Sequence, residues 1–352
     1  MTQSENSLAE WTPVRARNVS RAGHAADAPP VLLVVIDTEE EFDWSEPFDR
    51  RATGVDAFSE LPRLQEIFDQ AGARPTYAID YPVASTEKSV AVLKDFAQAG
   101  RMEIAAHLHP WVNPPHEEDV CPRNSYPGNL PGSLEEEKLA RLAGVIEDNF
   151  GARPRVYKAG RYGVGPNTLA ILKKLGFHCD LSLAPPFDFR GDGGPNYAAA
   201  PEAPFWIDAP GGVLEIPTTG GYYGALAGLG APMSRALQAV PEKAARLLRG
   251  AASRAGFVTR ARLSPEGHSL DALKKLTRAL IGRGVRALTF SLHSPSAAIG
   301  YTSYAADRDA RDRLLATCQG YLAFFRDEIG GGFATASEYR RLCVDALSGA
   351  EE

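Results

Sequence analysis

Short apolar runs alternate with amphipathic segments along most of the chain. The run from Val31 to Ile36 is continuous and rich in β-branched residues, which is typical of a strand buried on both faces of a parallel sheet. Further strands are expected at residues 75–79, 102–106, 155–158, 178–183, 205–207, 213–216 and 286–292. Helices are expected at residues 58–71, 87–99, 133–149, 166–176, 270–282 and 307–329. The alternation predicts an α/β architecture with a parallel sheet.

A single barrel fits this succession of elements. A (β/α) barrel of about seven strands, irregular and similar to a TIM barrel, is predicted, and a chain of 352 residues suits one such unit. We therefore predict one domain over residues 31–345. The polar residues 1–30 are predicted to form a disordered tail, and residues 346–352 a flexible one. Residues 111–132 predict a long loop, and residues 234–255 a helical insertion.

Charge and cysteine usage argue against several classes of partner and site. The net charge of −6 comes from interspersed acidic and basic residues, so nothing resembles the basic face of a nucleic-acid-binding protein. No apolar run approaches the roughly 20 residues of a membrane span. The 4 cysteines form no Cys-x-x-Cys pair, which argues against a thiolate zinc site. With no secretory signal, this usage predicts the cytoplasm, and the oligomeric state stays open.

Polar residues interrupt the apolar pattern at one recurring position. They fall at, or just beyond, the carboxyl ends of the expected strands: Asp37, Asp80, His107, Arg161, Asp180, Thr218 and His293. In a (β/α) barrel these ends meet on one face, where active sites are found. One polar residue at a strand end is common, but this recurrence favours a functional site.

Two pairs of residues have the chemistry of a metal site. Asp37 and Glu39 are two apart, so in extended backbone they share a face, and one could bind a metal while the other acts as a base. His107 and His109 have the same spacing. Paired neutral imidazoles with a carboxylate suit Zn²⁺ or a similar ion and leave a position open for water. His116 is the alternative second histidine.

A further histidine and several aromatic residues have two interpretations each. His293 follows an apolar run, where a histidine is more often part of the core, but its place at a strand end favours protonation of a leaving group. The aromatic residues that could either stack on a sugar or belong to the core are Trp44, Trp111, Tyr222 and Tyr223.

Four segments resemble motifs of the polysaccharide deacetylase (NodB-homology) family. The strand ending in Asp37 resembles the first motif, Thr-Phe-Asp-Asp-Gly, and residues 103–110 are similar to the second, Glu-Ile-Gly-Asn-His-x-x-x-His-Pro. Residues 157–163 resemble the third, Phe-Arg-x-x-Tyr-Gly, and residues 291–294 the fifth, Leu-x-His. The segments keep the family's order and span most of residues 31–340. The residues of these segments are similar to those of the WalW-type branch of the family, and the resemblance implies a NodB-type barrel.

The resemblance also implies roles for individual residues. Asp37 matches the general base, His107 the first metal histidine and His293 the general acid. Tyr162 matches the residue whose backbone N–H helps to hold the oxyanion. The implied cofactor is one divalent ion, Zn²⁺ or alternatively Co²⁺ or Mn²⁺.

The sequence departs from the family pattern at four points. Thr38 replaces the second acidic residue of the first motif, so Glu39 becomes the carboxylate ligand. The histidine spacing is shortened, which makes His109 the second ligand. Lys158 replaces the arginine of the third motif, and either it or Arg161 is expected to anchor Asp37. The fourth motif, of the type Asp-x-x-Asp-Trp, has no clear match, and Asp180 and Asp188 are its loose candidates.

These features predict a metal-dependent hydrolase of amides or esters. The expected reaction is N-deacetylation of an acetylated amino sugar, oligosaccharide or polysaccharide, with a smaller C–N-linked metabolite as the alternative substrate. A glycoside hydrolase is a second possibility, with Asp37 paired with Asp80 or Glu215. The third possibility, prompted by Thr38, is a non-catalytic carbohydrate-binding relic of the barrel.

Overall fold

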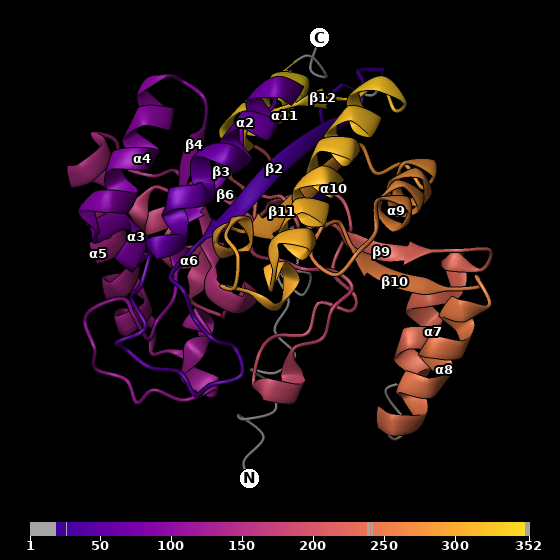
Figure 1. Cartoon of the computed structure of the whole chain (residues 1–352), viewed down its shortest axis with the longest axis horizontal. Coiled ribbons are helices and arrows are strands. Elements are labelled where there is room, and N and C mark those ends of the chain that lie inside the picture. Colours follow the sequence, from indigo (N-terminus) through magenta and orange to yellow (C-terminus); the bar gives the residue numbers. More distant parts are fainter. Residues whose placement is uncertain (1–18, 26, 238–239, 241, 349–352) are drawn as a thin grey trace.

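The computed structural model describes residues 19–25, 27–237, 240 and 242–348 and shows a mixed α/β fold built on one large sheet (Figure 1). Its parallel strands are β2 (Val31–Thr38), β3 (Thr76–Ile79), β4 (Glu103–Leu108), β5 (Val156–Ala159), β6 (Cys179–Asp180), β8 (Val213–Glu215) and β11 (Ala287–His293). They lie in the order β8-β6-β5-β4-β3-β2-β11. At one edge β7 (Phe205–Ile207) joins β8 and β1 (Val19–Arg21) joins β7, both antiparallel. The short β12 (Gly332–Phe333) pairs with β2.

The sheet curls into an incomplete barrel. Among the described residues, β8 and β11 are not joined by a strand ladder. Instead, the chain after β8 bridges the gap: the Thr289 N–H donates to the Thr219 hydroxyl at 2.7 Å, and the Thr289 hydroxyl donates to the Pro217 carbonyl at 3.0 Å. The predicted (β/α) barrel is therefore confirmed, as a curled half-barrel.

Helices cover the outside of the sheet. They are α2 (Leu61–Ala71), α3 (Tyr81–Ser85), α4 (Glu87–Gln98), α5 (Gly132–Phe150), α6 (Thr168–Leu175), α9 (Leu270–Gly282) and α10 (Arg308–Asp327). The last helix, α11 (Ala336–Ser348), instead packs Tyr339 and Cys343 in the smaller core cluster on the other face of the sheet. In α2 the spacing of Leu61, Leu64 and Phe68 places all three on one buried face, which packs in the large core cluster between helices and sheet. α10 lies between α2 and α9, and α5 contacts both α3 and α6.

Some predicted boundaries differ from those of the structure. The sheet begins within the predicted N-terminal tail, because residues 19–21 form β1, and α11 continues beyond residue 345. Residues 1–18 and 349–352 of the predicted tails lie outside the described residues. The strand predicted at residues 178–183 is only β6 (Cys179–Asp180), since the Leu183 N–H donates at 3.0 Å to the side-chain carboxylate of Glu215 and not to a backbone carbonyl of β8.

An excursion leaves the barrel after β8. β9 (Gly220–Tyr223) and β10 (Thr259–Arg262) pair antiparallel, and α7 (Gly230–Leu237) and α8 (Glu242–Arg254) lie between them in sequence. Figure 1 shows the two helices standing to one side of the main sheet, where the sequence predicted a helical insertion. β10 then carries the chain back towards the barrel.

The loop predicted at residues 111–132 contains only the short turns η3 (Arg123–Ser125) and η4 (Pro127–Asn129). It is tied down by Lys138 of α5, whose buried ammonium donates to the carbonyls of Pro110, Asn113 and Pro115 at 3.0, 2.6 and 2.6 Å. In the part of the chain that the structure describes, no helix has the length and apolar character needed to cross a membrane.

Candidate functional site

Alternation along the strands sends one set of side chains into the interior of the curled sheet. In β2, Val31, Leu33 and Val35 pack in the smaller core cluster, whereas Leu32, Val34 and Ile36 pack in the cluster that includes the outer helices. Because successive side chains of a strand alternate between faces, Asp37 continues the inner face. The same alternation places His107 on the inner face of β4 with Ala105, and Lys158 on the inner face of β5 with Val156. In β11, His293 lies on the same face as Ala287.

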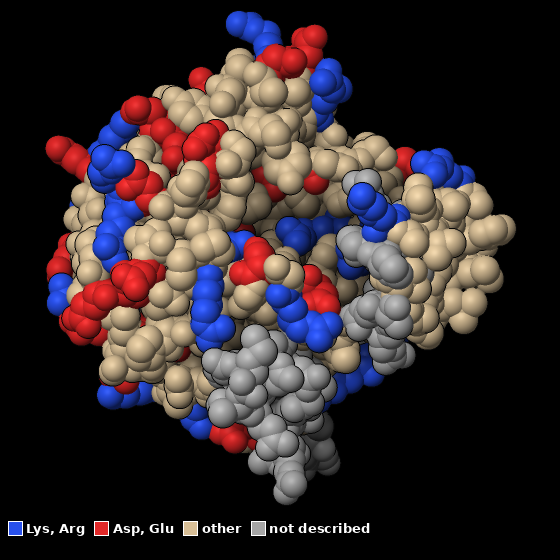
Figure 2. All heavy atoms as spheres, turned by 90° about the horizontal axis from the view of Figure 1, so that it is seen from below, with Lys and Arg blue, Asp and Glu red and all other residues tan. Residues whose placement is uncertain are grey.

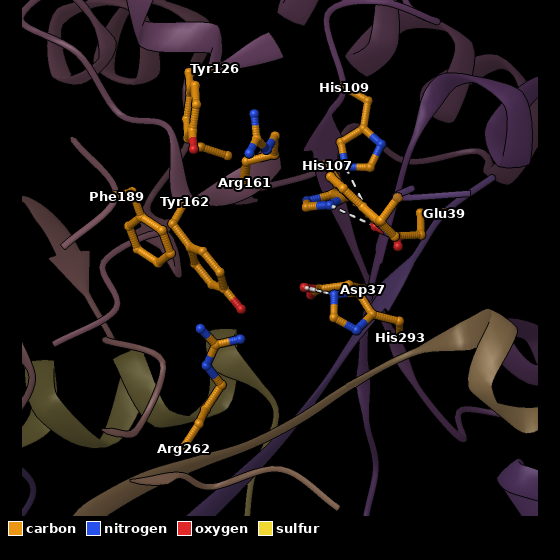
Figure 3. Close-up of a pocket in the computed structure, with 12 residues that line it drawn as sticks. Asp37, Glu39, His107, His109, Tyr126, Arg161, Tyr162, Phe189, Arg262 and His293 are labelled. Carbon is orange, nitrogen blue, oxygen red and sulfur yellow. Dashed lines mark ion pairs between the residues drawn. The ribbon is translucent and has the colours of Figure 1, made fainter. Parts of the chain in front are cut away.

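The register of the strands brings these residues together. His293 is paired directly with Asp37 across β11 and β2, and His107 with Lys158 across β4 and β5. A cavity of about 180 Å³ opens beside them, lined by Asp37, Glu39, Trp44, His107, His109, Tyr126, Ala159, Arg161, Tyr162, Phe189, Arg262 and His293 (Figure 3). Lys158, one of the two predicted anchors of Asp37, is not part of this lining and is buried in an ion pair with Asp37.

Three side chains converge at one side of the cavity. Nε2 of His107 lies 3.6 Å from Oε2 of Glu39, and Nε2 of His109 lies 3.5 Å from the same oxygen. Hydrogen bonds of this type are about 2.7–3.2 Å long, so these contacts are too long to be hydrogen bonds. All three ligand atoms lie within 4.8 Å of one another, which fits a single cation placed among them.

Hydrogen bonds on the far side of each ring fix the tautomers. Nδ1 of His107 lies 3.0 Å from the Lys158 carbonyl oxygen, and Nδ1 of His109 lies 2.9 Å from a Glu40 carboxylate oxygen. Because a backbone carbonyl can only accept, Nδ1 of His107 carries the proton and its Nε2 directs a lone pair at Glu39. The ionised form of Glu40 gives His109 the same tautomer. Burial lowers the pKa of both imidazoles, that of His109 to about 4. Neutral donors of this kind facing a carboxylate are the donor set of a divalent metal site.

Glu40 and Asp80 support His109 from behind. Asp80 accepts from the backbone N–H groups of Glu40 and Val83 at 2.9 Å, and the latter contact caps α3. Glu40, Asp80 and His109 are also close enough to hold an ion. However, the 2.9 Å contact between Glu40 and Nδ1 is a hydrogen bond, and the indole of Trp111 stacks on the His109 ring at 4.3 Å. Glu40 and Asp80 therefore orient the ring.

Asp37 lies beside the metal-ligand group and carries a negative charge. Burial by itself raises the pKa of this carboxyl, but the Lys158 ammonium, which forms a buried ion pair with it, and the neighbouring His107 and His293 bring the pKa below the ordinary range. Of the two predicted anchors of Asp37, Lys158 and Arg161, it is Lys158 that pairs with this carboxylate. The guanidinium of Arg161 instead pairs with Asp192 and lies 4.2 Å from the Tyr126 ring centroid.

His293 is held between two carboxylates. Its Nδ1 lies 2.7 Å from Glu266, which also accepts from the His293 backbone N–H at 3.1 Å, and its Nε2 lies 3.6 Å from Asp37. Burial opposes the imidazolium, but the charge of Glu266, with those of Glu39 and Asp37, raises the pKa of His293 well above its ordinary value. The neighbouring carboxylates thus favour the protonated form of His293, which lines the cavity.

The turn η5 (Gly160–Tyr162) forms the wall next to the histidines. Arg161 and Tyr162 have φ angles of 54° and 61°, in the left-handed region that side chains other than glycine rarely adopt. A Cβ at Gly160 would lie 2.3 Å from the Leu108 carbonyl oxygen and 2.5 Å from Cδ2 of His109. Only glycine therefore allows this turn to approach the end of β4. Backbone strain of this sort is often found at functional sites.

Several residues singled out in the sequence lie away from the cavity. Asp80, Asp180, Thr218 and Glu215 are buried in structural contacts, and Asp188 pairs with Arg190. His116 lies near Lys138 and Arg50 and is not part of the metal-ligand group. Of the four aromatic residues, Trp44 lines the cavity, Trp111 stacks on His109, and Tyr222 and Tyr223 belong to β9.

Sequence reasoning missed Tyr126, Ala159 and Phe189 of the cavity lining. It also missed Glu40, Glu266 and Arg262, which bear on the chemistry of the site. Glu40 belongs to the acidic run that follows β2, and its contact with His109 depends on a loop. Arg262 is the last residue of the excursion and Glu266 follows it, and no strand periodicity connects this segment to the barrel. The Pro-Glu-Gly turn at residues 265–267 was their only local signal.

Comparisons with known proteins support the fold. No family model and no curated protein sequence matches the chain. Among solved structures, a protein assigned as a polysaccharide deacetylase from Mycobacterium smegmatis is 15% identical, with 94% of this chain and 96% of that chain covered and a TM-score of 0.53. One with the same assignment from Pseudomonas aeruginosa PAO1 is 16% identical, with 89% and 90% covered and a TM-score of 0.53. The PuuE allantoinase is 14% identical, with 89% of each chain covered and a TM-score of 0.50. At these identities the likeness shows that the chain shares their barrel fold.

Proposed function

We propose that this chain is a metal-dependent hydrolase of the polysaccharide deacetylase type, acting on amide or ester bonds of an acylated substrate. N-deacetylation of an acetylated amino sugar is the reaction that its residues fit best. The observation that carries the proposal is the convergence of Nε2 of His107, Nε2 of His109 and Glu39 within 4.8 Å, beside a charged Asp37 and a charged His293. The two solved deacetylase structures with this fold support the same assignment.

Glu39, His107 and His109 would hold a divalent ion, with Zn²⁺ the first choice and Co²⁺ or Mn²⁺ the alternatives. Such an ion would supply positive charge that polarises a carbonyl oxygen and makes a nearby water more acidic. Asp37 accepts the proton of the attacking water. Lys158 keeps Asp37 ionised and holds its second oxygen towards the cavity. The left-handed turn at Tyr162 is the proposed position of a backbone N–H that stabilises the oxyanion.

His293 completes the reaction as the general acid. Its Nε2 faces the cavity while Nδ1 is held by Glu266, so the proton on Nε2 is available to the departing nitrogen. The arrangement places a base and an acid 3.6 Å apart on neighbouring strands. Water attack and leaving-group protonation can therefore proceed without a large movement of either side chain.

The glycoside hydrolase alternative finds no support in this geometry. It required a second carboxylate, from Asp80 or Glu215, across the cavity from Asp37. Both are buried outside the cavity lining and accept backbone N–H groups, Asp80 from Glu40 and Val83, and Glu215 from Leu183. The non-catalytic relic is distinguished only by an activity measurement. A cytoplasmic location and a place in the WalW-like branch stay predictions from the sequence.

Acetate release tests the proposal. The purified chain would be incubated with N-acetylglucosamine, its short oligomers and an aryl acetate ester, before and after chelation and re-addition of Zn²⁺, Co²⁺ or Mn²⁺. We expect release that stops on chelation, returns with metal and falls by about 10²-fold or more in Asp37→Asn. Metal binding without release from any substrate favours the relic. Release that survives both chelation and Asp37→Asn would contradict the mechanism.

A further inference from the structure

Three lysine and arginine side chains lie at the cavity, and two of them have carboxylate partners. Lys158 pairs with Asp37, and Arg161 pairs with Asp192. Arg262, the last residue of β10, lines the cavity without an ion pair to any residue that the structure describes. Its Nε–H is buried and has no hydrogen-bond acceptor. A buried donor without an acceptor is unfavourable unless a ligand supplies one.

Aromatic contacts hold the guanidinium of Arg262 in place. Its Cζ lies 4.9 Å from the Tyr162 ring centroid and 4.8 Å from the Phe187 ring centroid. Its backbone N–H donates to Nε2 of His268 at 3.4 Å. Figure 3 shows the guanidinium directed into the cavity next to Tyr162, across from Asp37 and His293. The position of this charge is thus set without any carboxylate.

Arg262 lies where two cavities meet. A second cavity of about 220 Å³ shares Arg262 and His293 with the first and has a polar lining that includes Ser264, Glu266 and His268. Figure 2 shows a hollow on the face seen from below, with Lys and Arg side chains visible inside it. A substrate group that reaches past the reacting bond therefore meets a cation.

We propose that Arg262 binds an oxyanion, a carboxylate or a phosphate, that the substrate carries, so that the acyl compound hydrolysed at this site is an acidic one. The inference rests on the proposed hydrolase function and adds a substrate class to it. The planar guanidinium presents its N–H groups as a fork that matches two oxygens of an oxyanion. Lys158 and Arg161 already pair with Asp37 and Asp192, so Arg262 is the guanidinium of the lining that is left to pair with an acidic group of the substrate.

Paired ligands test the inference by calorimetry on the full chain with Zn²⁺ added. The ligands are 2-acetamido-2-deoxyglucuronic acid with its methyl ester, and the 1- and 6-phosphates of N-acetylglucosamine with the free sugar. We expect at least one acidic member to bind about tenfold or more tightly than its neutral partner at low ionic strength. In Arg262→Gln this preference should disappear while the affinity for the neutral partner is unchanged. The carboxylate and phosphate pairs distinguish the two sources of the oxyanion.

Arg260→Gln is the matched control. Arg260 lies on the same strand and its loss changes the net charge equally, but it lines only the second cavity, so the preference should persist. Equal affinity for acidic and neutral members, or equal loss of the preference in both variants, overturns the inference. Acetate release, measured on the same samples, separates the two proposals. Acetate release without a preference for acidic ligands would support the hydrolase proposal and overturn the proposed anion site. Arg262-dependent binding of acidic ligands without any acetate release would support the anion site and contradict the hydrolase proposal.

Discussion

At the scale of single residues, the site depends on which nitrogen of each histidine carries a proton. A carbonyl oxygen on Nδ1 of His107 and a carboxylate on Nδ1 of His109 leave both Nε2 atoms as acceptors. At His293 the carboxylate on Nδ1 helps to raise the pKa of the ring instead, because Nε2 of this histidine faces Asp37 and not the metal-ligand group. The same residue type therefore serves as a ligand in β4 and as an acid in β11, according to what each ring nitrogen contacts.

Glu266→Gln tests the role of His293. The pKa of His293 is raised, so its acid form is present at low pH and is lost as the pH rises through that pKa. Removing the Glu266 charge lowers the pKa, and we expect the alkaline decline of kcat to move to lower pH by about one unit or more. Ser296→Ala removes a neutral donor to the same carboxylate and should move the decline much less. An unchanged decline in Glu266→Gln would show that His293 is not the acid.

At the scale of elements, the strands that could be predicted from sequence are the ones that place the site. Apolar runs ending in Asp37, His107 and His293 predicted the site residues at the strand ends. Alternation along each strand and the parallel pairing of the strands place these side chains on the same face of the sheet. Lys158 followed in the same way. Arg262 and Glu266 could not be predicted, since they return to the barrel through the β9–β10 pair, whose position depends on tertiary contacts and not on local pattern.

Gly160→Ala tests how the turn after β5 supports the end of β4. The added Cβ would lie 2.3 Å from the Leu108 carbonyl oxygen and 2.5 Å from His109, so the turn or the histidine must move. We expect a loss of about 1–3 kcal/mol in the free energy of unfolding and a roughly tenfold or greater loss in metal affinity. Urea unfolding and metal titration measure the two effects. Gly144→Ala in α5, where a Cβ meets nothing within 4 Å, should show neither loss. Unchanged metal affinity in Gly160→Ala would show that this turn does not support the metal-ligand group.

At the scale of the whole molecule, the barrel tolerates several buried acids beyond those of the site. Glu135 of α5 is one of them: the Thr168 hydroxyl donates to one of its oxygens, and the other oxygen has no partner. Burial raises its pKa from 4.5 to about 7. Since the folded chain favours the neutral acid, the stability due to this group is complete below the unfolded pKa and is lost as the pH rises through about 7.

Glu135→Gln should therefore flatten the dependence of stability on pH. We expect the wild type to lose up to about 3 kcal/mol between pH 5 and pH 8 through this group, and the variant to lose correspondingly less. Urea unfolding at the two pH values measures the difference. Glu136→Gln changes the neighbouring, more exposed carboxylate that pairs with Lys174, and should leave the wild-type dependence intact. An identical pH dependence in wild type and Glu135→Gln would contradict the raised pKa.

The central claim is that Glu39, His107 and His109 bind one metal ion. Elemental analysis of the purified wild type, His107→Ala and His116→Ala, after incubation with Zn²⁺, Co²⁺ or Mn²⁺ and removal of free metal, tests it most directly. His116 is the matched control, a histidine outside the ligand group. The structure predicts about one divalent ion per chain in the wild type and in His116→Ala, and almost none in His107→Ala. An empty wild type, or a His107→Ala variant that retains as much metal as His116→Ala, would contradict the metal centre.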